Sequence, residues 1–109
     1  MCELLSKKCT PCSGNTPKMS LESIKNYLSK LNNWEINENK EMIFKKFKFK
    51  NFKSAIEFTN LIANIAEEES HHPDISLGWG YCLIMIHTHA IKGLSVNDFI
   101  LAAKIDNIT

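Results

Sequence analysis

The sequence predicts an α+β domain of two layers, in which three helices cover one face of a four-stranded antiparallel sheet. Its 109 residues are one domain's worth of chain, and 44% of them are hydrophobic, which suffices for a single core. Segments with helical and strand-like hydrophobic periods follow one another in the order α-β-β-α-β-β-α. The links within each strand pair are short, and short links favour antiparallel hairpins.

We expect residues 1–19 to form a tail and residues 20–109 to form the domain. The tail holds two of the three prolines and has no apolar period. Cys9 and Cys12 form a CxxC motif there. A zinc site would need a second pair of ligands, and a thioredoxin-like redox site would need the motif on a strand-to-helix turn. Incidental thiols are the favoured interpretation, with metal or redox use as the alternative.

The first helix is expected to begin after Ser20, a residue type that caps helix N-termini, because apolar residues recur at helical spacing over 21–31. Two asparagines end it. Short strands are expected over 34–37 and 42–50, the second with phenylalanines alternating with lysines. This alternation is typical of a strand with one solvated face. A nucleic-acid surface is the weaker alternative, because neighbouring acidic residues cancel the positive field.

The longest helix is expected over 51–70, with a broad apolar stripe. It ends on three glutamates, 67–69, whose charge is unfavourable at a helix C-terminus. These carboxylates are either an electrostatic feature beside the histidines that follow or part of a solvated turn. Two more strands are expected over 74–80 and 81–90, with a turn within 78–80.

Ser95 is expected to cap a final helix, with Asp98 at the third helical position. This spacing is close to a capping box, in which each of the two side chains accepts a hydrogen bond from the other residue's backbone N–H. The helix residues expected to face inward are Phe99, Ala102, Ala103 and Ile105.

Composition excludes several classes of function. The net charge is only +1, so a strong electrostatic grip on nucleic acid is not expected. No stretch approaches the ~20 apolar residues that span a membrane, and no signal-peptide core is visible, so we expect a cytoplasmic protein with reduced thiols. No Gly-rich phosphate loop and no Ser or Cys nucleophile motif is present.

Any chemistry must therefore come from the four histidines, which all lie within positions 71–89. His71 and His72 are adjacent and precede a proline, which favours extended backbone. His87 and His89 are two apart on an expected strand, hence on one face of it. Spacing alone leaves metal binding, general acid–base catalysis and ordinary structural histidines open.

The expected last strand has two unlike faces. Leu83 and Met85 lie beside His87 on the more open face, which indicates a partner subunit or the floor of a ligand site. The helix-covered face is expected to hold Cys82, Ile84, Ile86 and Thr88, so Cys82 needs no redox role.

The histidines belong to a longer pattern that resembles the signature of pterin-4a-carbinolamine dehydratases: Glu67-x3-His71-His72-Pro73-x5-Trp79-x9-His89-x8-Asp98. Every element of that signature is present. Trp34, the segment 47–52 and the segment 88–95 also resemble family landmarks, and the resemblance covers residues 20 to 106.

The resemblance implies a hydro-lyase that converts 4a-hydroxytetrahydropterin to quinonoid dihydropterin and water. This reaction serves the recycling of tetrahydrobiopterin, or a related pterin, beside an aromatic amino acid hydroxylase. It implies no metal and no other cofactor, since the pterin is the substrate, and assembly as a homodimer or homotetramer. Some animal members also act as dimerisation cofactors of a transcription factor, so a non-catalytic binding module is the alternative.

By matching positions, the resemblance assigns His71 and His89 as the catalytic pair, one giving a proton to the leaving 4a-hydroxyl and the other taking the N5 proton. Which is acid and which is base stays open. His72 is expected to orient the substrate. Further substrate contacts are expected from Glu67, Pro73, Thr88, Trp79 and Trp34, although core packing is the alternative for one of the tryptophans.

Glu67 lies one helical turn before His71 and could hold its ring. Asp98 matches the signature but is expected to be structural, at the positive end of the last helix. Position 70 is Ser where some members have an acidic residue, and Glu69 could partly substitute. His87 lies outside the signature and is expected to be incidental.

Overall fold

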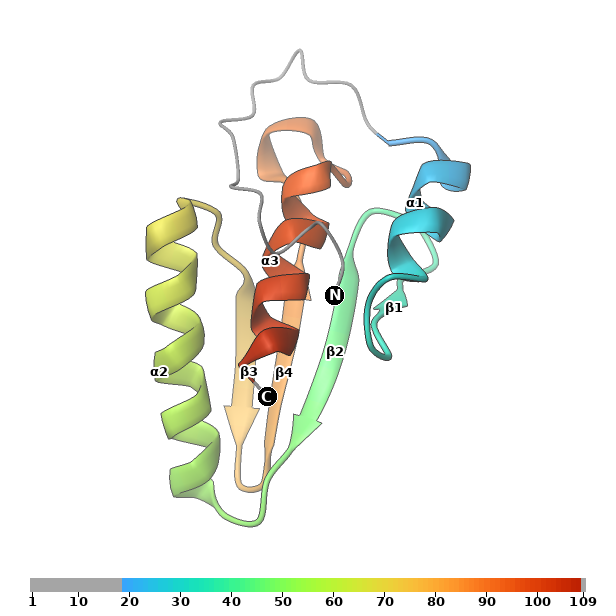
Figure 1. Ribbon diagram of the computed structural model, residues 1–109. Helices are drawn as coiled ribbons and strands as arrows, with labels where there is room; N and C mark the ends of the chain where they lie inside the picture. Colours follow the sequence, from blue (N-terminus) through green and yellow to red (C-terminus); the bar gives the residue numbers. More distant parts are fainter. Residues whose placement is uncertain (1–18, 109) are drawn as a thin grey trace.

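The structure is a computed structural model that describes residues 19–108. The expected tail lies, except for Met19, outside these residues, and so do Cys9 and Cys12. The helices and strands follow the predicted order within 19–108 (Figure 1). Their bounds are α1 Leu21–Leu28, β1 Glu35–Ile36, β2 Ile43–Lys48, α2 Phe52–Glu69, β3 Asp74–Gly78, β4 Tyr81–Ile86 and α3 Val96–Asn107.

The four strands form one antiparallel sheet in the order β1-β2-β4-β3. Figure 1 shows α2 and α3 against one face of this sheet, with α1 beside β1 at the edge. Tyr27 of α1 stacks on Phe99 of α3 with ring centroids 5.4 Å apart, which joins the first helix to the helical layer. The predicted two-layer α+β fold is confirmed.

The core lies between β4 and the helices. Cys82, Ile84 and Ile86 are fully buried, and Thr88 continues the same face, as predicted. Burial raises the pKa of the Cys82 thiol, so the thiol stays protonated near neutral pH. Within residues 19–108 no helix combines the length and the apolar character needed to cross a membrane.

The α2 helix ends at Ser70, which adopts the left-handed conformation (φ 53°) and donates its N–H to the carbonyls of Ala66 and Glu67. This is the usual way to stop a helix, although a residue other than glycine adopts it at a cost of roughly 1 kcal/mol. The sharp turn sets the direction in which His71 leaves the helix. One glutamate of the helix end, Glu69, is buried and pairs with Lys104 of α3, so it belongs neither to a solvated turn nor to an ion pair with a histidine.

The predicted last strand, 81–90, is too long. β4 ends at Ile86, and the chain folds back through a single bridge between Thr88 and Gly93 that encloses a 3₁₀ turn, His89–Ile91. The Thr88 N–H donates to the Gly93 carbonyl at 2.9 Å, which closes this loop in place of further sheet pairing. His89 therefore does not share a strand face with His87.

The capping box at the start of α3 is confirmed: Asp98 accepts a hydrogen bond from the backbone N–H of Ser95. At the other end of the same helix, Asp106 joins α3 to the sheet. Its carboxylate accepts from the Trp34 indole N–H at 3.0 Å, the Asn32 backbone N–H at 3.1 Å and the Lys45 ammonium at 2.9 Å.

Replacing Asp106 by Ala should lower the free energy of unfolding by about 3 kcal/mol, because the buried indole N–H of Trp34 and the Lys45 charge lose their shared acceptor. Urea denaturation followed by tryptophan fluorescence and circular dichroism measures this change. Glu38→Ala, at an exposed loop position, is the control and should change stability by less than about 0.5 kcal/mol. Equal stabilities of the two variants would contradict the role given to Asp106.

Candidate active site

His71 lies in the connection from α2 to β3, and its ring is paired with Asp98 of α3. The His71 Nε2 and Asp98 Oδ1 atoms are 2.6 Å apart. The His71 side chain is 12% exposed, whereas the Asp98 side chain is fully buried. The two residues are 27 positions apart in sequence, and the packing of α2 beside α3 brings them together.

Asp98 is itself fixed by donors from two other segments. Its Oδ2 atom accepts from the Thr88 hydroxyl at 2.9 Å and from the Ser95 backbone N–H at 2.8 Å. Thr88 gives its one hydroxyl proton to Asp98, so the Ser95 hydroxyl, 2.7 Å away, donates to Thr88. These hydrogen bonds compensate for the burial of a carboxylate and fix its orientation.

The pairing with Asp98 determines how His71 can exchange a proton. A carboxylate only accepts hydrogen bonds, so we assign the Nε2–H to His71 as donor. Nδ1 is then the ring atom left to exchange a proton with a substrate. When Nδ1 is also protonated, the positive ring lies next to the buried carboxylate.

A cavity of about 200 Å³ brings His71 together with His72, Thr88 and His89. Its other lining residues are Ser70 and Ala90. Three of the four histidines thus line one small space at the end of the sheet. His71 and His72 come from the turn after α2, and His89 comes from the loop after β4. Thr88 lines this space too, but its hydroxyl serves Asp98 and Ser95.

The structure gives Glu67 a different partner from the one expected. Glu67 contacts the Nε2 atom of His72, and the role of holding the His71 ring falls to Asp98. Because the left-handed turn at Ser70 ends the helix, the helical spacing that would place Glu67 beside His71 no longer applies. His72 and Glu67 are both exposed, so their pairing orients the His72 ring and adds little stability. Pro73 follows as the link to β3 and is not among the residues that line the cavity of about 200 Å³.

Within residues 19–108, neither tryptophan is among the residues that line the cavity of His71, His72 and His89. Trp34 is buried in the core, where its ring lies edge-on to Phe47 and its N–H bonds Asp106. Trp79 is 73% exposed in the turn after β3. That turn is at the opposite end of the sheet from the histidines, because Asp74 is the β3 residue at their end. The core-packing alternative therefore holds for Trp34, and in residues 19–108 Trp79 lies apart from the histidines.

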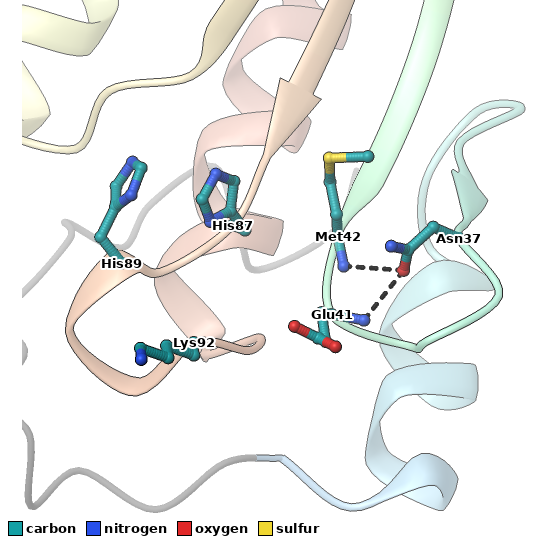
Figure 2. Close-up of a pocket in the computed structure, with 6 residues that line it drawn as sticks. All are labelled: Asn37, Glu41, Met42, His87, His89 and Lys92. Carbon is teal, nitrogen blue, oxygen red and sulfur yellow. Dashed lines mark hydrogen bonds between the residues drawn. The ribbon is translucent and has the colours of Figure 1, made fainter.

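A second cavity, of about 400 Å³, shares the lining residue His89 with the first, and Figure 2 shows the residues that line it. It is lined by Asn37, Glu41, Met42, His87, His89 and Lys92. His87, expected to be incidental, lies here with its ring centroid 4.1 Å from that of His89 and its Nε2 3.2 Å from an Asp74 oxygen. Residues of the β1–β2 connection were not predicted to join the histidines, and no motif in the sequence marks them.

In the part of the chain from 19 to 108, no three His, Cys, Asp or Glu side chains are arranged to hold a metal ion. Three histidines instead have one carboxylate partner each. The pairs are His71 with Asp98, His72 with Glu67, and His87 with Asp74.

Comparison with known proteins places this geometry in a family. A protein of Rickettsia bellii (strain OSU 85-389), named provisionally as a pterin-4-alpha-carbinolamine dehydratase, is 50% identical over 106 residues, which are 96% of this chain and 93% of the relative. A protein of Methylococcus capsulatus with the same provisional name is 41% identical over 98% of this chain and 94% of its own.

Solved structures agree with the fold. The crystal structure of a transcriptional coactivator/pterin dehydratase from Brucella melitensis has a TM-score of 0.80 and 27% identity, over 84% of this chain and 98% of that one. A pterin dehydratase-like protein identified as a RuBisCO assembly factor in the alpha-carboxysome has a TM-score of 0.61 and 26% identity, over 71% and 89%. The family profile described as "Pterin 4 alpha carbinolamine dehydratase" matches residues 17–108, and the chain belongs to that family.

Proposed function

We propose that this protein is a hydro-lyase that dehydrates 4a-hydroxytetrahydropterin, with His71 and His89 as its proton-transfer residues. The observation that carries the proposal is the small cavity that both rings line, with one ring held by a buried carboxylate. Family membership and the names of the relatives support the same reaction. The substrate would come from a pterin-dependent aromatic hydroxylation in the cytoplasm.

The reaction breaks the C4a–O bond and the N5–H bond, forms the C4a=N5 double bond, and releases the hydroxyl as water. One proton must reach the leaving oxygen and one must leave N5, so an acid and a base are required on the two sides of one bond. Two imidazoles facing one cavity supply both, and no step calls for a metal or a second cofactor. Proton transfer of this kind contributes about 10²- to 10⁴-fold in rate per group.

The surroundings of the two rings differ. Protonated His71 would carry its positive charge beside Asp98, and a carboxylate so placed supports an imidazole that takes a proton as well as one that gives it. The His89 ring lies against the ring of His87, with centroids 4.1 Å apart. Either ring can therefore serve as the acid or as the base, with His72 orienting the pterin.

Glu67 would support His72, and Thr88 would support Asp98, so both act on the substrate through other residues. Pro73 would fix the direction of the chain after His72. A homodimer or homotetramer is the assembly that we propose.

The alternative function is a non-catalytic binding module, which the coactivator and assembly-factor names of the two solved relatives favour. The intact pairing of His71 with Asp98 favours the enzyme.

Replacing His71 or His89 by Ala should lower the rate of carbinolamine dehydration by about 10²- to 10⁴-fold, because each variant loses one proton-transfer group. The rate is followed by ultraviolet absorbance with freshly generated carbinolamine, after correction for the uncatalysed reaction. Glu57→Ala, at an exposed position of α2, is the control and should keep wild-type activity. A double variant as fast as the wild type would exclude the proposed mechanism and leave the binding module.

Replacing Asp98 by Asn should lower kcat by about 10²-fold or more, since the amide nitrogen cannot accept the His71 Nε2–H and would favour the other tautomer. Asp106→Asn makes the same chemical change on the same helix, away from the histidines, and should keep kcat while lowering stability. The measurements are kcat across pH and the melting temperature of both variants. If Asp98→Asn lost stability but no activity, Asp98 would be a helix cap only.

A further inference from the structure

We propose that His87 is a positioning residue for His89: its ring, bonded to Asp74, holds the ring of His89 at the cavity of about 200 Å³, the smaller of the two cavities. The inference rests on the proposed function, because it takes His89 to be a proton-transfer residue. His87 lies outside the signature, so the proposal adds a functional residue that the resemblance does not assign.

The first argument is that His89 lacks the packing that would fix its ring. It is an exposed residue in the 3₁₀ turn of the irregular loop after β4. His71, in contrast, is 12% exposed and is bonded to the buried Asp98. An exposed imidazole on a loop can adopt several rotamers, whereas proton transfer at one substrate atom needs a particular one. A contact other than burial must therefore select the rotamer of His89.

The second argument is the contact between the two rings. The ring centroids of His87 and His89 are 4.1 Å apart and their planes are inclined by 60°, and Figure 2 shows the rings next to each other. His89 lines both cavities, whereas His87 lines only the larger of the two, so His87 contacts His89 from the side of the larger cavity. The ring of His89 cannot swing in that direction without displacing His87. The contact thus favours the rotamer in which His89 stays at the smaller cavity with His71.

The third argument is that His87 is itself held in place. Its Nε2 lies 3.2 Å from an Asp74 oxygen, and because a carboxylate only accepts hydrogen bonds, the Nε2–H is the donor. Sheet register explains this pairing. Asp74 lies opposite Met85, and His87 follows Met85 by two residues, which is a diagonal separation that long side chains can span. The Asp74 side chain is 60% exposed, so the pair orients the His87 ring and adds little stability.

The fourth argument is the place of Asp74 in the chain. It is the first residue of β3 and follows His71 by three positions. The short connection from α2 to β3 therefore carries one proton-transfer histidine and leads directly to the carboxylate that anchors the ring next to the other. His71 is bonded to a carboxylate directly, whereas His89 is linked to one through His87. Both histidines thus have a positioning group, although only one has it in direct contact.

The kinetic test compares His87→Ala with His87→Phe, which keeps a flat ring next to His89 but loses the bond to Asp74. In His87→Ala, kcat for dehydration should fall by about 10- to 10²-fold with KM nearly unchanged, because a misplaced proton-transfer group costs rate and not binding. His87→Phe should restore most of kcat. Tyr81→Ala removes a ring at the far end of β4 and is the control, which should keep the wild-type kcat.

A second readout does not depend on activity. Three-bond couplings measured by nuclear magnetic resonance on the full-length protein report the χ1 rotamer of His89. One rotamer should dominate in the wild type and in His87→Phe, whereas His87→Ala should show averaging among rotamers. Asp74→Ala, a change at an exposed position that spares the core, should give partial averaging because the His87 ring loses its anchor.

Averaging in the wild type, or one dominant rotamer in His87→Ala, would overturn the proposal. A rise in KM at unchanged kcat in His87→Ala would overturn it too, since His87 would then be a substrate contact. These outcomes are separate from failure of the proposed function. A wild type that accelerates no dehydration would lose the enzyme, and the rotamer of His89 would still decide whether His87 positions it.

Discussion

The buried carboxylate of Asp98 is the group on which the arrangement of the site depends. It accepts hydrogen bonds from the Ser95 N–H at the start of α3, from the Thr88 hydroxyl in the loop after β4, and from the His71 ring after α2. Burying a carboxylate is costly unless several donors compensate for it, so the three segments must meet in one geometry for the fold to be stable. The same requirement fixes the His71 ring and leaves its Nδ1 for chemistry. Capping a helix and holding the His71 imidazole are thus achieved by one side chain.

The irregular loop after β4 is the second constraint. Had the strand continued to position 90, the side chain of His89 would have been fixed on the face of the sheet opposite Thr88 and the helices. Instead, the bridge from Thr88 to Gly93 closes a tight loop and places His89 between two cavities. Both cavities depend on this loop, because one reaches toward His71 and the other toward the β1–β2 connection. The site is therefore built where regular sheet pairing ends.

The sequence was a good guide wherever the interaction was local. Hydrophobic periods located the helices and most strand residues, and the spacing of Ser95 and Asp98 predicted the capping box. It failed where side chains meet across long separations. Helical spacing suggested Glu67 for His71, but the left-handed turn at Ser70 gave that role to a residue 27 positions away. Trp79 was expected near the substrate, yet register places its turn at the far end of the sheet.

Signature positions and cavity positions overlap only in part. Three signature histidines line the smaller cavity and Asp98 holds one of them, whereas the signature residue Trp79 lies at the far end of the sheet. Asn37, Glu41 and Lys92 lie outside the signature and line the larger cavity together with His89. The near-zero net charge of the chain fits the pterin substrate that we propose, because a neutral ring is better held by local donors and acceptors than by a long-range field.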